Sequence, residues 1–139
     1  MATIQKFEDL EIWQLARVLA KNIFVLSQTG QLAKDFSLKD QMNRSSGSIM
    51  DNIAEGYGRG SRLEFIQFLS ISTGSADELK SQLFRCLDKG YLSKENFDDL
   101  YEKTNVVYKQ INGFIKYLNT TLVKGTKFKE RAGVKNNGK

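Results

Sequence analysis

The hydrophobic residues of this chain recur every three or four positions, which is the spacing of one face of an α-helix. The most regular stretch comprises Phe97, Leu100, Thr104, Val107, Ile111, Phe114 and Leu118. A parallel row follows at intervals of seven: Tyr101, Tyr108, Ile115 and Leu122. A stripe of this width is typical of a helix that faces the core of a bundle, so we expect a helix over about residues 94–123.

The same period predicts three earlier helices, over about residues 9–28, 38–56 and 62–89. The first carries two adjoining apolar rows, one of Ile12, Leu15, Leu19, Ile23 and Leu26, the other of Trp13, Ala16, Ala20 and Phe24. Together they cover about half of the helix, more than the ~100° stripe of a one-sided surface helix. This helix either lies between two neighbours of its own bundle or packs its Trp13–Phe24 row on another subunit.

The second and third helices each carry a single apolar stripe. The second stripe is Leu38, Met42, Ser46, Ile49, Ile53 and Tyr57, and the third is Phe65, Phe68, Leu69, Ser72, Ala76, Leu79, Leu83 and Leu87. On the third helix, Ile66 and Phe84 share a direction about 100° away from the stripe. Two large apolar groups on a polar face are candidates for contact with a partner.

Capping residues and glycines mark the expected ends of these helices. Ser37 with Asp40 and Ser61 with Glu64 have the spacing of capping boxes, and Ser93 begins the last helix. Gly30 and Gly90 are expected to close the first and third helices. Between the second and third helices we expect Gly56, Gly58 and Gly60 to form a corner with positive φ angles.

Short connections between four helices predict an all-α fold, an antiparallel up-down-up-down four-helix bundle over residues 1–123. A length of 139 residues suits one such domain.

The net charge of +5 lies entirely in residues 124–139, because residues 1–123 hold fifteen basic and fifteen acidic side chains. This basic tail lacks helical periodicity, and we expect it to be disordered or ordered only by a partner.

Composition argues against catalysis and against a membrane or small-molecule partner. The chain has no histidine and one cysteine, Cys86, so a metal site is not expected and no internal disulfide can form. Cys86 falls in an apolar stripe and has the features of a small buried hydrophobe. The run GYGRGS lacks the lysine of a phosphate-binding loop. We therefore expect no catalytic residues and no cofactor, and a cytoplasmic location, since no signal peptide or membrane span is evident.

A charged row on the second helix, Arg44, Ser48, Asp51 and Glu55, is typical of a solvated face. Glu55 and Arg59 are four residues apart, and we expect them to have a structural role. If that pair is buried, removal of one partner would cost ~3–5 kcal/mol. We expect Glu55→Ala to unfold or disassemble the protein.

Three segments of the chain are distinctive: FEDLEIWQLA, QMNRSSGSIMDNIAEGYGRGSRLEFIQFL and GSADELKSQLFRCLDKGYL. Over about residues 7–122 they resemble the 23S rRNA intervening-sequence protein family, bacterial proteins encoded within insertions of large-subunit ribosomal RNA genes. The resemblance implies a four-helix bundle and a homopentamer around a central channel. A relative of similar fold, the accessory protein of diversity-generating retroelements, binds RNA and a reverse transcriptase.

The family's motif falls on Arg44, Ser48, Ile49, Asn52, Ile53, Ala54, Glu55, Gly56, Gly58, Arg59, Gly74, Ser75 and Glu78. The chain departs from the usual pattern at two places. Its first interhelical loop reads Ala33-Lys34-Asp35-Phe36 where a phenylalanine-proline step is common, and Ser45 and Ser46 stand where alanines are common.

Two functions remain open at this stage. The first is a non-catalytic oligomer that binds nucleic acid, with RNA favoured, through its phosphates. Its candidate residues are Arg44, Arg59, Arg62, Lys80, Arg85, Lys124, Lys127 and Lys129. The alternative is an adaptor that docks a protein such as a polymerase through an apolar helix face. The candidate interface residues, for a partner or for the subunits of an oligomer, are Trp13, Phe24, Ile66 and Phe84.

Overall fold

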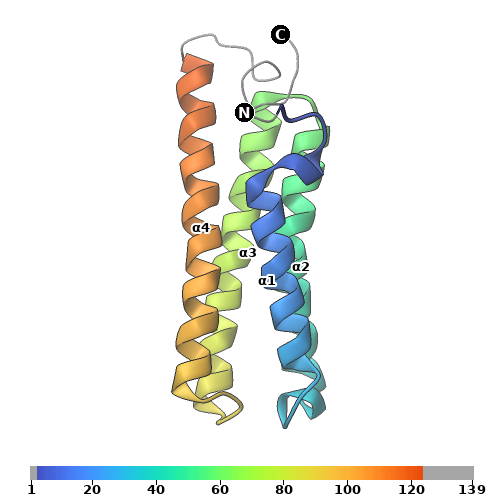
Figure 1. The fold of residues 1–139 in the computed structure, drawn as a ribbon, viewed down its shortest axis with the longest axis vertical. Helices are drawn as coiled ribbons and strands as arrows, with labels where there is room; N and C mark the ends of the chain where they lie inside the picture. Colours follow the sequence, from blue (N-terminus) through green and yellow to red (C-terminus); the bar gives the residue numbers. More distant parts are fainter. Residues whose placement is uncertain (1–2, 124–139) are drawn as a thin grey trace.

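The computed structural model describes residues 3–123, with side chains up to residue 120. Its elements are η1 (Phe7–Asp9), α1 (Glu11–Ser27), η2 (Leu32–Lys34), α2 (Phe36–Gly58), α3 (Arg62–Asp88) and α4 (Lys94–Val123). The four long helices run alternately up and down and lie nearly parallel to one long axis (Figure 1). The predicted antiparallel four-helix bundle is confirmed.

Each long helix packs on its two neighbours around the bundle. α2 contacts α1 and α3, and α4 contacts α3 and α1, so α1 and α3 stand at opposite corners. The α2–α3 contact is the most extensive, whereas α1 and α4 touch least among the neighbouring pairs. In Figure 1 this leaves a seam between α4 and α1, with α3 behind it.

The core matches the apolar stripes of the sequence. On α4, six residues of the most regular row are buried: Phe97, Leu100, Thr104, Val107, Ile111 and Leu118. Phe114 of that row, and Tyr101, Tyr108 and Ile115 of the parallel row, are partly buried. On α1, the Ile12–Leu19–Ile23 row is buried, while the second row is covered at Ala16 and ends at Phe24, 54% of which is exposed. The first row of α1 therefore belongs to this bundle, and its second row turns outward along part of its length.

Cys86 is fully buried, with its sulfur 3.3 Å from that of Met42. Burial raises the pKa of its thiol to about 11. The expectation of a small buried hydrophobe is confirmed.

The expected start of the second helix is wrong by two residues. Asp35, not Ser37, caps α2, because its carboxylate accepts a hydrogen bond from the Leu38 N–H at 3.2 Å. Ser37 lies within the helix and accepts from the Gln41 amide instead. The loop that departs from the family's pattern thus forms the short helix η2 and supplies the cap of α2.

Asp35 also ties the start of α2 to the end of α3. Its carboxylate accepts from the Lys89 ammonium at 3.0 Å and from the Tyr91 hydroxyl at 2.8 Å. These two hydrogen bonds, with the one from the Leu38 N–H, lower the pKa of Asp35 from 3.8 to about 2. The folded protein therefore favours the ionised carboxylate.

We expect this link to make the stability of the folded protein depend on pH in the acidic range. A lowered folded-state pKa gives a stabilisation that is complete above the ordinary value of 3.8 and is lost as the pH falls towards 2. Asp35→Asn keeps a capping oxygen but removes the charge. The melting temperature of Asp35→Asn should lie below that of the wild type at pH 7 and approach it near pH 2. A constant gap across that range would contradict the prediction.

The expected glycine corner is also partly wrong. Gly56 and Gly58 lie within α2, and of the three glycines only Gly60 has a positive φ, of 74°. The chain turns at Arg59-Gly60-Ser61, and the Ser61 hydroxyl caps α3 by accepting from the Glu64 N–H. Gly30 and Gly90 take positive φ angles as expected.

Candidate nucleic-acid interface

The five predicted cations within the described bundle lie in three places. Arg59 and Arg62 lie at the turn between α2 and α3, Arg44 and Arg85 lie on the outer side of the α2–α3 pair, and Lys80 faces α4. Lys124, Lys127 and Lys129 lie outside the described residues. The structure therefore does not gather the predicted set into one patch.

Lys80 is held within the packing of α3 against α4. Only 15% of its side chain is exposed, and its ammonium lies 3.3 Å from the Asp77 carboxylate. The same ammonium lies 4.2 Å from the centre of the Tyr108 ring and 3.4 Å from the Asn105 side-chain oxygen. With these contacts Lys80 stabilises the α3–α4 interface and presents little charge to a phosphate.

Arg59 has carboxylates on both sides. It pairs with Glu55 at 3.0 Å and with Glu64 at 3.8 Å, and its guanidinium lies over the Phe68 ring. About half of each side chain of the Glu55–Arg59 pair is exposed, 55% and 47%. The condition for a costly buried pair is therefore not met within one chain.

We now expect Glu55→Ala to cost at most ~1 kcal/mol of folding free energy, as exposed ion pairs usually contribute. Asp51→Ala, on an exposed position of the same helix, is the matched control. Urea unfolding of both variants measures the difference. A loss above ~3 kcal/mol for Glu55→Ala alone would mean that a partner buries this carboxylate.

Three polar residues of the family motif, Ser48, Asn52 and Ser75, meet on the outer side of the α2–α3 pair. The Ser48 and Ser75 hydroxyls are 2.9 Å apart, and the Asn52 amide donates to the Ser48 backbone and hydroxyl oxygens. These small side chains allow α2 and α3 to approach closely. A groove of about 330 Å³ follows this contact, lined by Gln41, Arg44, Ser45, Ser48, Glu78 and Gln82.

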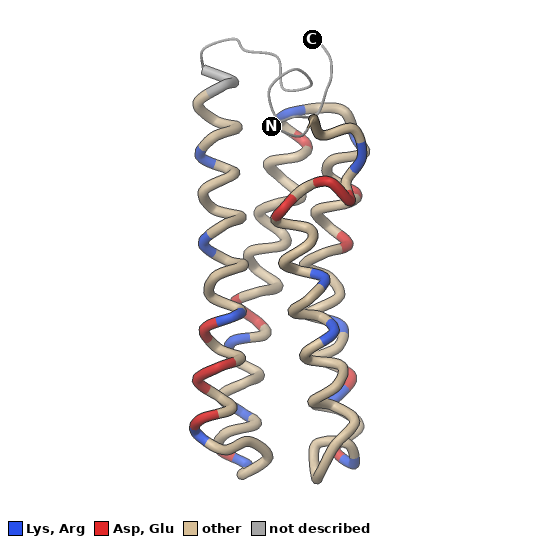
Figure 2. The backbone as a smooth tube through the Cα atoms, viewed as in Figure 1, with Lys and Arg blue, Asp and Glu red and all other residues tan. Residues whose placement is uncertain are grey.

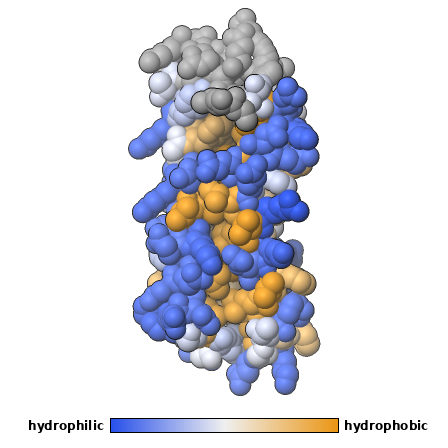
Figure 3. Space-filling model, viewed as in Figure 1, coloured by the Kyte–Doolittle hydropathy of each residue, from blue (hydrophilic) through white to orange (hydrophobic). Residues whose placement is uncertain are grey.

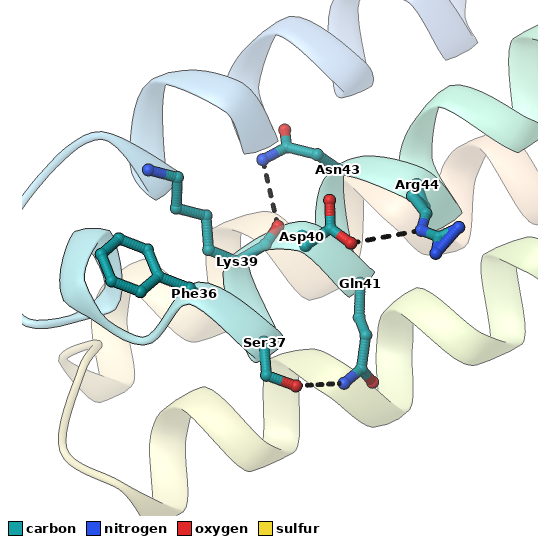
Figure 4. Close-up of a pocket in the computed structure, with 7 residues that line it drawn as sticks. All are labelled: Phe36, Ser37, Lys39, Asp40, Gln41, Asn43 and Arg44. Atoms are coloured by element: carbon teal, nitrogen blue, oxygen red, sulfur yellow. Dashed lines mark hydrogen bonds and ion pairs between the residues drawn. The ribbon is translucent and has the colours of Figure 1, made fainter.

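Arg44 and Arg85 border this groove and are each engaged. Arg44 pairs with Asp40 at 3.3 Å, and Arg85 donates to the Gln41 side chain at 3.1 Å. Figure 4 shows Arg44 and Asp40 beside Gln41 on the first turns of α2. Both arginines are exposed, so they are accessible to an anion that displaces weak surface contacts.

The sequence interpretation missed a basic row on α4. Lys109 and Lys116 are seven residues apart on one exposed face, and no acidic residue follows Glu102 until Glu130. Residues 103–139 carry nine basic and one acidic side chain, while residues 1–102 carry twelve and fifteen. Figure 2 shows the row along the upper half of α4, above a mixed lower half. Counting the charged residues separately before and after Glu102, rather than before and after residue 123, would have found this row.

The four predicted interface residues form two separate surfaces, because α1 and α3 occupy opposite corners. On α1, Trp13 is partly buried against Phe7 at 5.1 Å between ring centres, and Phe24 is exposed. On α3, Ile66 is partly buried. Phe84 is 47% exposed, although its ring lies 4.8 Å from that of Phe97.

Two features are absent from the part of the chain that the structure describes. No group of three or more histidine, cysteine, aspartate or glutamate side chains is close enough to hold a metal ion there. Among the same residues, no helix combines the length and hydropathy needed to cross a membrane.

The fold defines the class of this protein: an antiparallel four-helix bundle with a polar α2–α3 groove. The family model of the 23S rRNA-intervening sequence protein matches residues 8–113, and the chain belongs to that family. The fold is similar to the crystal structure of a protein of unknown function from the S23 ribosomal protein family of Bacteroides thetaiotaomicron. The TM-score is 0.70 at 24% identity, over 76% of this chain and 95% of that one. No curated protein matches the chain.

Proposed function

We propose that this protein is a non-catalytic, oligomeric nucleic-acid-binding protein that contacts RNA phosphates through α4 and the residues that follow it. The observation that carries the proposal is the charge separation at Glu102, after which the chain holds nine basic residues and one acidic residue. Lys109 and Lys116 extend this charge onto the exposed face of a rigid helix. RNA is the nucleic acid we propose, because the similar accessory protein of diversity-generating retroelements binds RNA.

Assembly would multiply this charge. In a symmetric oligomer each basic row is repeated in every subunit, and the summed field attracts a polyanion more strongly than one chain does. The family resemblance favours a homopentamer. The exposed apolar residues of α1, Val18, Phe24 and Val25, support contact with another copy.

Fluorescence anisotropy with a labelled single-stranded RNA, titrated at several salt concentrations, tests the proposal. Lys109→Gln with Lys116→Gln should make the negative slope of log affinity against log salt shallower by about 1.4, because each lost phosphate contact on a single strand contributes ~0.7. Lys94→Gln with Lys103→Gln changes the charge of α4 equally and is the control, since both lysines pair with neighbouring aspartates.

Deletion of residues 124–139 should weaken RNA binding by more than tenfold at low salt, because six of the nine cations are lost. Unchanged affinity would exclude the tail from the interface. Equal losses in the two lysine pairs, or no binding at low salt, would overturn the proposed function.

A protein-docking function is the second candidate, favoured by the exposure of Phe24 and Phe84. Light scattering distinguishes the two uses of these surfaces. An oligomeric mass that falls for Phe24→Ser assigns the α1 surface to another copy of the chain. A monomer of unchanged mass would leave that surface for a different protein.

A further inference from the structure

A groove between the N-terminal segment and the C-terminal half of α4 has a mainly apolar lining. Its apolar walls are Ile4, Leu10 and Ile12 on one side and Phe114 and Tyr117 on the other, around about 490 Å³. Gly113 adds to the α4 wall, and nothing lies within 4 Å of the position its Cβ would take. Figure 3 shows hydrophobic side chains exposed along the seam between α4 and α1. The groove has room for one large side chain.

The two rims of this groove carry opposite charges. Glu8, Asp9 and Glu11 lie within four residues on η1 and the first turn of α1, and Glu11 lines the groove itself. Lys109 lines the opposite, α4 side. Figure 2 shows the acidic residues of η1 and α1 across the seam from the basic row of α4. An apolar segment flanked by cations would therefore match the groove and its acidic rim.

The chain itself supplies such a segment close by. Phe128 is the one aromatic residue after Val123, and Lys127 and Lys129 flank it. Five residues of extended chain reach roughly 16 Å. Along α4, Tyr117 and Phe114 lie roughly 9 Å and 14 Å before Val123, at 1.5 Å per residue. A tail that reverses direction after α4 can therefore bring Phe128 beside these two rings.

We propose that residues 124–129 fold back along α4 and insert Phe128 into this groove, with Lys127 and Lys129 beside Glu8 and Glu11. Covalent attachment favours this occupant, because a short tether gives an effective concentration in the millimolar range. A separate partner would have to exceed that concentration or bind more tightly. The proposal does not depend on RNA binding.

Paramagnetic relaxation in the full-length chain tests the contact. A spin label on Ala132→Cys, in a Cys86→Ala background, would lie about 13 Å along the chain from Phe128. We expect the label to broaden the backbone amide signals of Leu10, Ile12 and Gly113. The signals of Gly30 and Gly90, at the other end of the bundle (Figure 1), should remain sharp.

Tethering alone broadens the last turn of α4, so the decisive comparison is between variants. Phe128→Ala should lower the relaxation enhancement at Leu10 and Gly113 at least twofold, and Gly113→Leu, which fills the groove, should do the same at Leu10. Val134→Ala removes another apolar tail residue and should change nothing. The core of the described bundle is complete without Phe128 and Val134, so we expect both variants to fold.

Two results would overturn the proposal. One is broadening at Leu10 and Gly113 that Phe128→Ala leaves unchanged. The other is equal broadening in a mixture of isotope-labelled, spin-free protein with spin-labelled, isotope-free protein, since the tail would then dock on a second copy.

Discussion

Gly56→Ala is expected to destabilise the protein by roughly 1–3 kcal/mol, although alanine is the better helix former by ~1 kcal/mol. A Cβ on Gly56 would lie 2.6 Å from the Cβ of Phe68 and 3.0 Å from the Phe65 ring. The Cβ of Phe68 is fixed to the backbone of α3, so it cannot rotate away. The two helices must separate along their most extensive contact.

Two other glycines of α2 are matched controls. Gly47 and Gly58 have no atom within 4 Å of the position of an added Cβ. Gly47→Ala should therefore stabilise the protein by up to ~1 kcal/mol, and Gly58→Ala, at the end of the helix, by less. Urea unfolding of the three variants, followed by circular dichroism, measures the contrast.

A second substitution locates the cause of the Gly56→Ala effect. Phe68→Ala retains a Cβ, so it should not rescue Gly56→Ala. Rescue by Phe68→Ala would mean that the phenyl ring, rather than the approach of the two backbones, limits the space at Gly56. A Gly56→Ala variant as stable as Gly47→Ala would refute the close approach itself.

The sequence was sufficient for the helices and their inward faces, because helical periodicity is local information. The uninterrupted stripe of α4 and the buried position of Cys86 followed from spacing alone. The role of Gly56 did not follow, because a helical glycine in contact with another helix and a glycine of a turn look the same in one sequence. The link from Asp35 to the end of α3 did not follow either, because its partners Lys89 and Tyr91 are more than fifty residues away.

Individual charges were harder to interpret than apolar positions. Lys80 had the sequence features of an exposed cation, yet its stem and ammonium are covered by α4 through Tyr108. The basic row of Lys109 and Lys116 was not recognised because the net charge of residues 1–123 is zero. The acidic residues of 1–102 offset these lysines in that sum. The position of each lysine in the fold, rather than the number of lysines, decides which positive charges a polyanion can reach.

Phe65→Ala is expected to destabilise the protein more than Gly56→Ala does, by ~3–5 kcal/mol. Phe65 is fully buried, and its ring meets Phe114 at 5.6 Å and Tyr57 at 6.0 Å between ring centres. Phe65 therefore packs α2, α3 and α4 together. Its ring lies next to Gly56, whose lack of a side chain leaves room for it. Its loss leaves a cavity that three helices would have to close together.

Phe84→Ala removes the same side chain from the same helix at an exposed position and is the matched control. Because the Phe84 ring is half exposed and contacts the rings of Phe97 and Tyr101 at the surface, its truncation should cost about 1 kcal/mol or less in unfolding free energy. Chemical denaturation at two protein concentrations separates folding from assembly. If the cost of Phe84→Ala approaches that of Phe65→Ala and grows with protein concentration, another subunit buries Phe84. If the two costs are equal at both concentrations, the core position of Phe65 is contradicted.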